Sequence, residues 1–132
     1  MTHELFWLMM TIIMTGLLWI PYTIDRIMVR GLEPTLDNPG PNALPQSQWA
    51  QRLMAAHTNT VENLVTFAPL VIIAHLLQIS DGLTITACVL FFASRLAYAV
   101  IYAWGVPVFR TLSFIASWTA QIIMVLEIFR IV

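Results

Sequence analysis

The sequence predicts an all-α integral membrane protein that forms a bundle of four transmembrane helices. Apolar residues make up 59% of the 132 positions and charged residues only 10%, and the mean hydropathy is +0.81. Soluble domains carry roughly a quarter charged residues, and a soluble fold of this size cannot bury so much apolar surface. A spanning helix needs about 20 apolar residues, so four helices and their connectors account for a single domain over residues 1–132.

Charges, prolines and glycines divide the chain into four apolar segments. We expect helices over about 5–24, 48–79, 83–104 and 108–131. Between the first two, residues 31–47 contain four of the seven prolines and two glycines, which argues against a continuous helix and predicts a long loop. Asp81-Gly82 and Gly105-Val106-Pro107 are typical of tight turns between the remaining helices.

The charged residues and the cysteine exclude several classes of function. Six arginines, with no lysine, stand against seven acidic residues, so the chain has no basic field for nucleic acid. The single cysteine, Cys88, excludes an internal disulfide and a cysteine metal cluster, and we expect no metal site. The N-terminus lacks both a basic start and a small-residue cleavage site, so the first helix is expected to remain in the mature protein.

The placement of arginine predicts how the bundle is oriented in the bilayer. Arg26, Arg30, Arg52 and Arg110 fall on one side of the predicted helices, and Arg130 falls on the other side. Short cytoplasmic segments carry an excess of positive charge, which puts the long loop in the cytosol and both termini outside. The opposite turn, at residues 81–82, is too short to carry a site, so we expect chemistry at the cytosolic end.

Three of the predicted helices each carry a polar stripe. At about 100° per residue, the stripe of the second helix occupies an arc of roughly 100°, whereas His57 points to the far side. A charged side chain in the membrane costs about 2.5–3.5 kcal/mol on insertion scales, so we expect the stripes to face one another and to converge on one site. Their members are Arg52, Asn59, Glu62, Asn63 and Thr66; Arg95, Tyr98 and Tyr102; and Arg110, Ser113, Ser117 and Gln121.

Such a site suits a ligand that carries carboxylates and an amine. Arg52 or Arg95 could take a carboxylate through paired hydrogen bonds, and Glu62 could take the amine. Arg110 and Thr111, at the start of the last helix, could stabilise an anion such as a thiolate. Two structural interpretations stay open: the polar side chains hydrogen-bond the helices together, or Arg95 and Glu62 form an ion pair inside the bundle.

Three segments of the chain resemble one family of membrane proteins. The stretch Ala56-His57-Thr58-Asn59-Thr60-Val61-Glu62-Asn63-Leu64 resembles the second-helix motif of the MAPEG family, the membrane-associated proteins of eicosanoid and glutathione metabolism. The run Arg95-Leu96-Ala97-Tyr98 with Tyr102, and the segment from Pro107 to Thr111, are similar to the same family. The resemblance covers most of the chain, is closest to the short bacterial branch, and includes the four-helix layout.

The resemblance implies a homotrimer that binds glutathione between neighbouring subunits near the cytosolic face. The family's glutathione enzymes usually carry arginine where Ala55 stands, and Arg52, one turn earlier, is the candidate substitute. Some members have histidine at the position of Tyr98. By motif position, the chain matches the glutathione site at Asn59, Glu62, Arg95, Tyr102, Arg110 and Thr111.

We therefore expect a glutathione or small-thiol transferase or peroxidase in a bacterial inner membrane. Arg110 and Thr111 would stabilise the thiolate, and a small apolar electrophile would enter from the bilayer. The alternative is a non-catalytic lipid-binding or scaffold protein, since the resembling family contains a member that presents fatty acid to another enzyme. A transporter is disfavoured because the sequence has no inverted repeat and no pair of glycine-broken helices.

Overall fold

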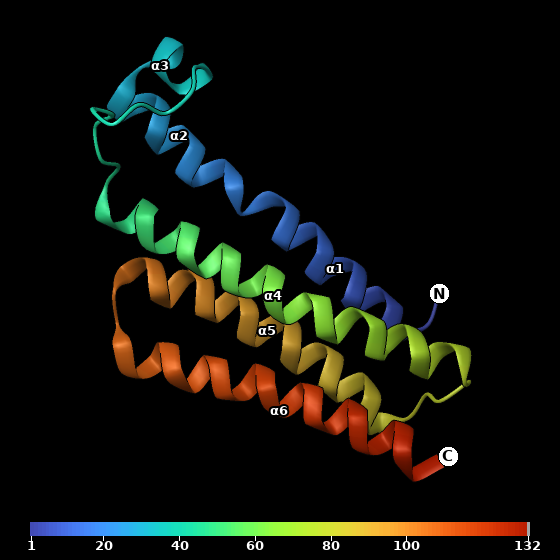
Figure 1. Cartoon of the computed structure of the whole chain (residues 1–132). Coiled ribbons are helices and arrows are strands. Elements are labelled where there is room, and N and C mark those ends of the chain that lie inside the picture. Colours follow the sequence, from blue (N-terminus) through green and yellow to red (C-terminus); the bar gives the residue numbers. More distant parts are fainter. Residues whose placement is uncertain (132) are drawn as a thin grey trace.

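The computed structural model describes residues 1–131, with side chains up to Arg130, and every regular element in that range is an α-helix. The helices are α1 (His3–Leu17), α2 (Trp19–Arg30), α3 (Leu32–Leu36), α4 (Gln48–Leu76), α5 (Gly82–Trp104) and α6 (Pro107–Ile131). Because α1 and α2 follow one another almost end to end, they form a single long apolar segment (Figure 1). Four segments are thus long and apolar enough to cross a membrane, and the expected four-helix bundle is confirmed.

Helix α5 is the most buried of the four apolar segments, and it packs against α1, α4 and α6 (Figure 1). The interior is held by two apolar clusters, one in each half of the bundle. In the larger cluster, the rings of Phe67 on α4 and Phe91 on α5 stack in parallel with centroids 3.8 Å apart, and both side chains are fully buried. Cys88 is buried in the same cluster, where its side chain packs with the apolar residues.

The first apolar segment is longer than expected and is interrupted at Leu18. Pro21 has no N–H group to donate to the Leu17 carbonyl, and its ring crowds that carbonyl, so the helix breaks there. It resumes as α2 and continues past Ile24 to Arg30. The expected loop also contains one short helix, α3, because Pro34 lies in the first turn of α3, where no helical N–H donor is needed.

Helix α4 ends at Leu76, three residues before the expected boundary. Gln78 adopts a positive φ of 58°, which takes the chain out of the helical conformation. Its N–H donates to the His75 carbonyl and the Ile79 N–H donates to the Ala74 carbonyl, a pairing typical of a Schellman motif. The helix therefore closes its own C-terminus before the chain reaches Asp81, which caps the start of α5.

Candidate functional site

A buried arginine lies between the three helices that carry polar stripes. Arg95 on α5 has no exposed surface, and its Nη1 donates a 2.8 Å hydrogen bond to Oδ1 of Asn59 on α4. Its guanidinium carbon lies 4.5 Å from the ring centroid of Tyr98 and 5.8 Å from that of Phe114 on α6. Its Nε and Nη2 have no hydrogen-bond partner among the described residues. The site therefore holds a buried cation, two of whose N–H-bearing nitrogens have no acceptor within the described part of the chain.

Asn59 connects Arg95 to a chain of side-chain hydrogen bonds that runs from α4 to α6. The Asn63 amide donates to Oδ1 of Asn59 at 3.2 Å, and the Gln121 amide donates to Oδ1 of Asn63 at 3.1 Å. Thr66 in turn donates to Oε1 of Gln121. These bonds join α4 to α5 and to α6, so members of all three predicted stripes meet inside one chain.

Aromatic rings cover the cations at the Trp104 end of the bundle. The rings of Tyr98 and Tyr102, one turn apart on α5, have centroids 5.5 Å apart. The guanidinium carbon of Arg110 on α6 lies 4.7 Å from the centroid of Tyr102. Arginine over an aromatic face is stabilised by the ring quadrupole. Tyr98, Tyr102 and Arg110 thus belong to the same local cluster as Arg95.

Within the chain, Arg52 contacts the C-terminal end of helix α5. Its Nε donates a 3.0 Å hydrogen bond to the carbonyl oxygen of Ala103, near the C-terminus of α5. Its guanidinium also packs against Gly105, where an added Cβ would lie 3.2 Å from the guanidinium carbon. The last carbonyls of a helix lack partners within the helix, so Arg52 acts here as a side-chain cap for α5.

Glu62 and Thr111, two other predicted site residues, are exposed in the single chain. Among the described side chains Glu62 forms no ion pair, so Arg95 does not pair with it within the chain. The Thr111 hydroxyl donates to the carbonyl of Pro107, one turn earlier in α6. An exposed carboxylate within a membrane-spanning helix requires a polar neighbour from outside the chain, because lipid does not solvate it.

A set of contacts joins α2 to α4 and to the segment that leads into it, and the sequence did not predict these contacts. Tyr22 and the Nδ1 of His57 are 2.7 Å apart, which joins α2 to α4 on the face opposite the polar stripe. The Asp25 carboxylate accepts hydrogen bonds from both the hydroxyl and the N–H of Ser47. The far-side direction of His57 was a signal of a separate partner, but the sequence did not identify that partner as Tyr22.

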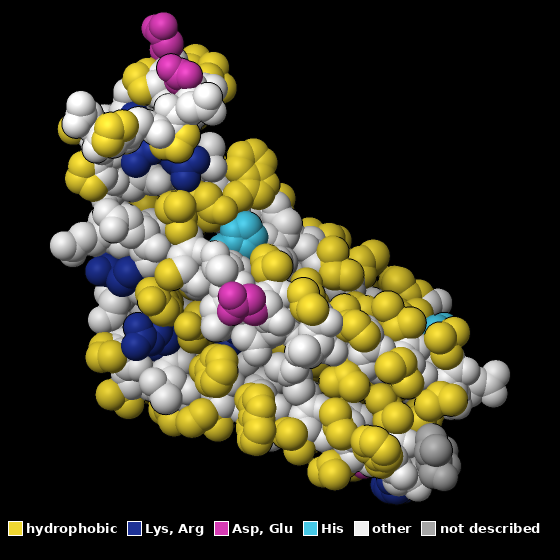
Figure 2. All heavy atoms as spheres, viewed as in Figure 1, with side chains coloured by type: hydrophobic (Ala, Val, Ile, Leu, Met, Phe, Trp, Pro, Cys, Tyr) yellow, Lys and Arg dark blue, Asp and Glu magenta, His cyan; other side chains and the backbone are white. Residues whose placement is uncertain are grey.

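Two arginines that were expected only to set the topology hold the long loop in place. Arg26 donates to Oε1 of Gln46 at 3.1 Å, and Arg30 donates to the carbonyl of Leu44 at 2.6 Å. On the face shown in Figure 2, arginine spheres gather toward the end of the molecule that carries the loop, while apolar side chains cover most of the long helices. The positive charge is therefore concentrated at one end of the bundle.

Comparison with known protein families agrees with this architecture. The model of the MAPEG family matches residues 5–130 of the chain, a stretch that contains all the residues of the candidate site and nearly all of the four apolar segments. No curated protein and no solved structure matches the chain. The family assignment therefore rests on the family model. Inferences about chemistry rest on the geometry of Arg95, Asn59, Tyr102 and Arg110.

Proposed function

The chain belongs to the MAPEG family, and on that premise we propose that it activates glutathione, or a related small thiol, for reaction with apolar electrophiles. It would act as a membrane-embedded transferase or peroxidase. Four apolar segments and the family indicate a multi-pass membrane protein. We place the long loop in the cytosol, both termini outside, and the protein in a bacterial inner membrane, because the arginines gather at the loop end.

The observation that carries this proposal is the state of Arg95. Among the described residues, this fully buried guanidinium has no acidic partner and two of its nitrogens have no hydrogen-bond acceptor, a costly state unless an anion completes it. A carboxylate of the thiol substrate matches this need, because arginine binds carboxylates through paired hydrogen bonds. Asn59 fixes the third nitrogen and Tyr98 covers one face, so the remaining donors are pre-oriented.

The thiolate would be stabilised by Arg110, which lies against Tyr102 at the same end of the bundle. A nearby fixed positive charge lowers the free energy of the thiolate relative to the thiol. Thr111 would assist once its hydroxyl leaves the Pro107 carbonyl. The thiol proton passes to solvent, and the sulfur then forms a bond to the electrophilic carbon as the leaving group departs.

A neighbouring copy of the chain would complete the site. Glu62 is exposed on a spanning helix, and the proposed amine of the thiol substrate is a suitable partner for its carboxylate. Contact with a second subunit would remove Glu62 from lipid and enclose the substrate between chains. We therefore propose a homotrimer, in line with the family, with Arg52, Asn59, Glu62, Arg95, Tyr98 and Tyr102 as the thiol-binding set.

The test is thiol-dependent conjugation to chlorodinitrobenzene by the purified full chain in detergent. Removing one group that stabilises developing charge costs about 10²–10³ in rate, so we expect that loss for Arg110→Ala. Arg130→Ala is the matched control, because Arg130 lies at the other end of α6, where it pairs with Glu127. Equal rates in wild type and Arg110→Ala would remove Arg110 from the mechanism.

One observation favours the second candidate, a non-catalytic lipid-binding or scaffold protein. The Asn63 amide donates to Asn59 and accepts from Gln121, and Arg52 donates to the end of α5, so much of the polar stripe has a structural role. Thermal unfolding separates the two functions, since a ligand that binds the folded state raises the unfolding temperature. Stabilisation by lipid but none by millimolar glutathione would favour the scaffold.

A further inference from the structure

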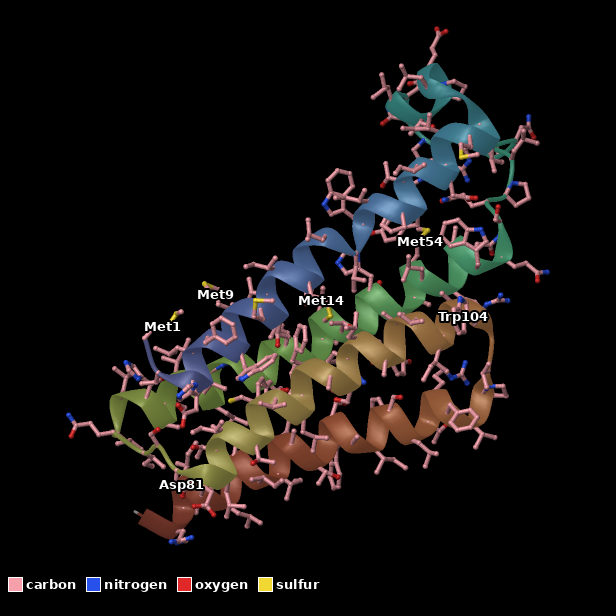
Figure 3. All side chains as sticks on the ribbon, turned by 180° about the vertical axis from the view of Figure 1, so that it is seen from behind. Met1, Met9, Met14, Met54, Asp81 and Trp104 are labelled. Atoms are coloured by element: carbon pink, nitrogen blue, oxygen red, sulfur yellow. The ribbon has the colours of Figure 1, made fainter. Side chains whose placement is uncertain are left out.

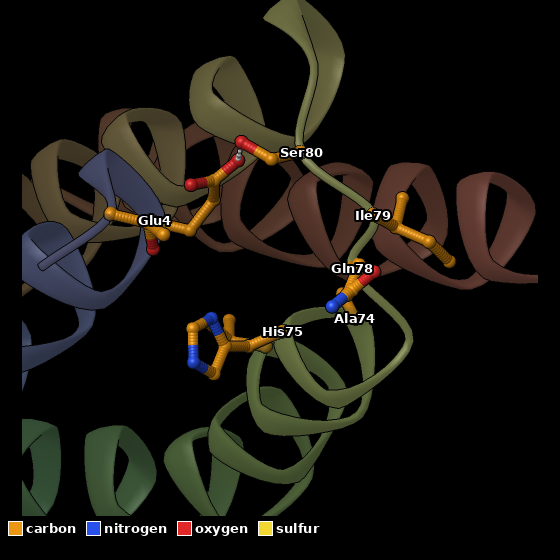
Figure 4. A pocket seen from close by; sticks show the side chains of 8 residues that line it. Glu4, Ala74, His75, Gln78, Ile79 and Ser80 are labelled. Atoms are coloured by element: carbon orange, nitrogen blue, oxygen red, sulfur yellow. Dashed lines mark hydrogen bonds between the residues drawn. The ribbon is translucent and has the colours of Figure 1, made fainter.

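A second polar feature lies at the end of the bundle remote from Arg95 and Arg110. The labelled residues Asp81 and Trp104 mark the two ends of α5 in Figure 3, and this feature lies at the Asp81 end. It is a cavity of about 240 Å³ between the start of α1, the end of α4 and the turn into α5. The polar side chains that line it include Glu4, His75, Gln78 and Ser80 (Figure 4).

Glu4 is a buried carboxylate at the wall of this cavity. Only 4% of the surface of Glu4 is exposed. Its Oε1 accepts hydrogen bonds from the hydroxyls of Ser80 at 2.8 Å and Thr84 at 2.7 Å. Its other oxygen, Oε2, has no hydrogen-bond donor among the described residues. A buried acceptor without a donor costs about 1–3 kcal/mol, and more when it is charged. The carboxylate therefore favours a donor that enters the cavity.

The lining selects among the possible donors. Groups of three or more histidine, cysteine, aspartate or glutamate side chains able to hold a metal ion are absent from the described residues, so the cavity is not a metal cage. No arginine lines it, and the nearby Arg130 pairs with Glu127. Val71, Ala74 and Ile79 add apolar side chains to the lining. A ligand that matches this lining has a compact cationic donor next to an apolar part.

We propose that this cavity binds a primary ammonium group, carried by a lipid headgroup or by a free amine, with Glu4 as its counter-charge. An ammonium offers three N–H donors, enough for Glu4 Oε2 and for acceptors on Gln78 and Ser80. The cavity lies where the first apolar segment begins, which is the depth of a lipid headgroup. It uses none of the residues assigned to thiol chemistry.

The test measures thermal unfolding of the full chain in detergent with added phosphatidylethanolamine, phosphatidylcholine, phosphatidylglycerol or free ethanolamine. We expect phosphatidylethanolamine to raise the unfolding temperature more than phosphatidylcholine, whose quaternary nitrogen has no N–H, and phosphatidylglycerol to have no comparable effect. Stabilisation by ethanolamine alone at millimolar concentration would identify a free amine as the source. Stabilisation that needs the phospholipid would identify the headgroup.

Glu4→Gln removes the charge and keeps the shape, so it should weaken the affinity for phosphatidylethanolamine about tenfold or more. Glu33→Gln is the control, because Glu33 is an exposed carboxylate on α3. Equal stabilisation by phosphatidylglycerol, or an unchanged response in Glu4→Gln, would overturn the proposal. If Glu4→Gln does not fold, a phosphatidylethanolamine with a photoreactive headgroup should label residues 71–80 of the wild type. Labelling confined to other segments would also overturn it.

Discussion

Arg52 on α4 donates a hydrogen bond from Nε to the carbonyl oxygen of Ala103 on α5, 3.0 Å away. This bond links residues that are 51 positions apart in the sequence. It places positive charge beside the C-terminal carbonyls of α5, where the helix dipole is negative. Gly105 ends α5 with a φ of 80° and leaves room for the guanidinium. The end of α5 and the start of α4 are therefore held together by one side chain.

Gly105→Ala should destabilise the protein by about 1–2 kcal/mol, because a Cβ is strained at positive φ and would lie 3.2 Å from the Arg52 guanidinium carbon. Gly16→Ala is the control, since a Cβ there meets nothing within 4 Å. Alanine inside a helix is favoured over glycine by about 1 kcal/mol, so Gly16→Ala should keep or raise stability. Thermal unfolding in detergent compares the two, and equal losses would contradict a specific role for Gly105.

Arg95→Met should separate stability from thiol binding. Replacing a buried charge by an apolar side chain of similar length is often neutral or stabilising, and within the described part of the chain the variant loses a single hydrogen bond, to Asn59. We expect an unfolding temperature equal to or above that of the wild type, with no further rise on adding glutathione. Arg130→Met, at an exposed arginine, should keep the glutathione response. A full response in Arg95→Met would show that the thiol binds elsewhere.

The contact between Tyr22 and His57 should contribute to the attachment of α2 to α4. Their side chains are 2.7 Å apart, and a hydrogen bond of this kind is worth about 1 kcal/mol. Tyr22→Phe and His57→Phe should each cost about that much, and the double variant should cost less than the sum. Thr58→Ala is the neighbouring control, because its hydroxyl bonds only within α4. Strict additivity of the two losses would contradict a direct bond.

Asp81 should make stability depend on pH. The Thr84 N–H holds the pKa of the Asp81 carboxyl below its ordinary value, and the Leu83 N–H acts in the same direction against the effect of burial. A lowered pKa means that the stabilisation is present above the unfolded-state value of about 3.9 and is lost as the pH falls through the folded-state pKa.

Asp81→Ala should therefore lower the free energy of unfolding by about 1 kcal/mol near neutral pH, because the helix cap is lost. The difference in unfolding free energy between this variant and the wild type should shrink below about pH 4. Asp81→Asn is the matched control, since asparagine caps helices well but does not titrate. We expect it to retain most of the stability at neutral pH without the acid-dependent loss. A constant difference between wild type and Asp81→Ala at every pH would rule out the ionised carboxylate as the source.

Helical periodicity predicted which face of a helix each polar residue lies on, but not every contact that the residue makes. Spacing along each helix placed Asn59 and Asn63 on one face and His57 on another, and the contacts follow that division. Spacing assigned Arg52 and Glu62 to the same arc as Asn59, yet Arg52 caps α5 and Glu62 is exposed. Long side chains reach beyond the arc of their Cα atoms, so the direction around a helix does not determine the partner.

Hydropathy and turn residues were sufficient to predict four apolar segments in an all-α bundle, because lipid demands long apolar helices whose backbone groups are internally satisfied. Packing between distant segments decided the rest. It buried Arg95 against Asn59 and Tyr98, directed Arg52 to the end of α5, and left one Glu4 oxygen without a donor among the residues that the structure describes. These outcomes depend on the depth and rotation of neighbouring helices, which a hydropathy pattern does not encode.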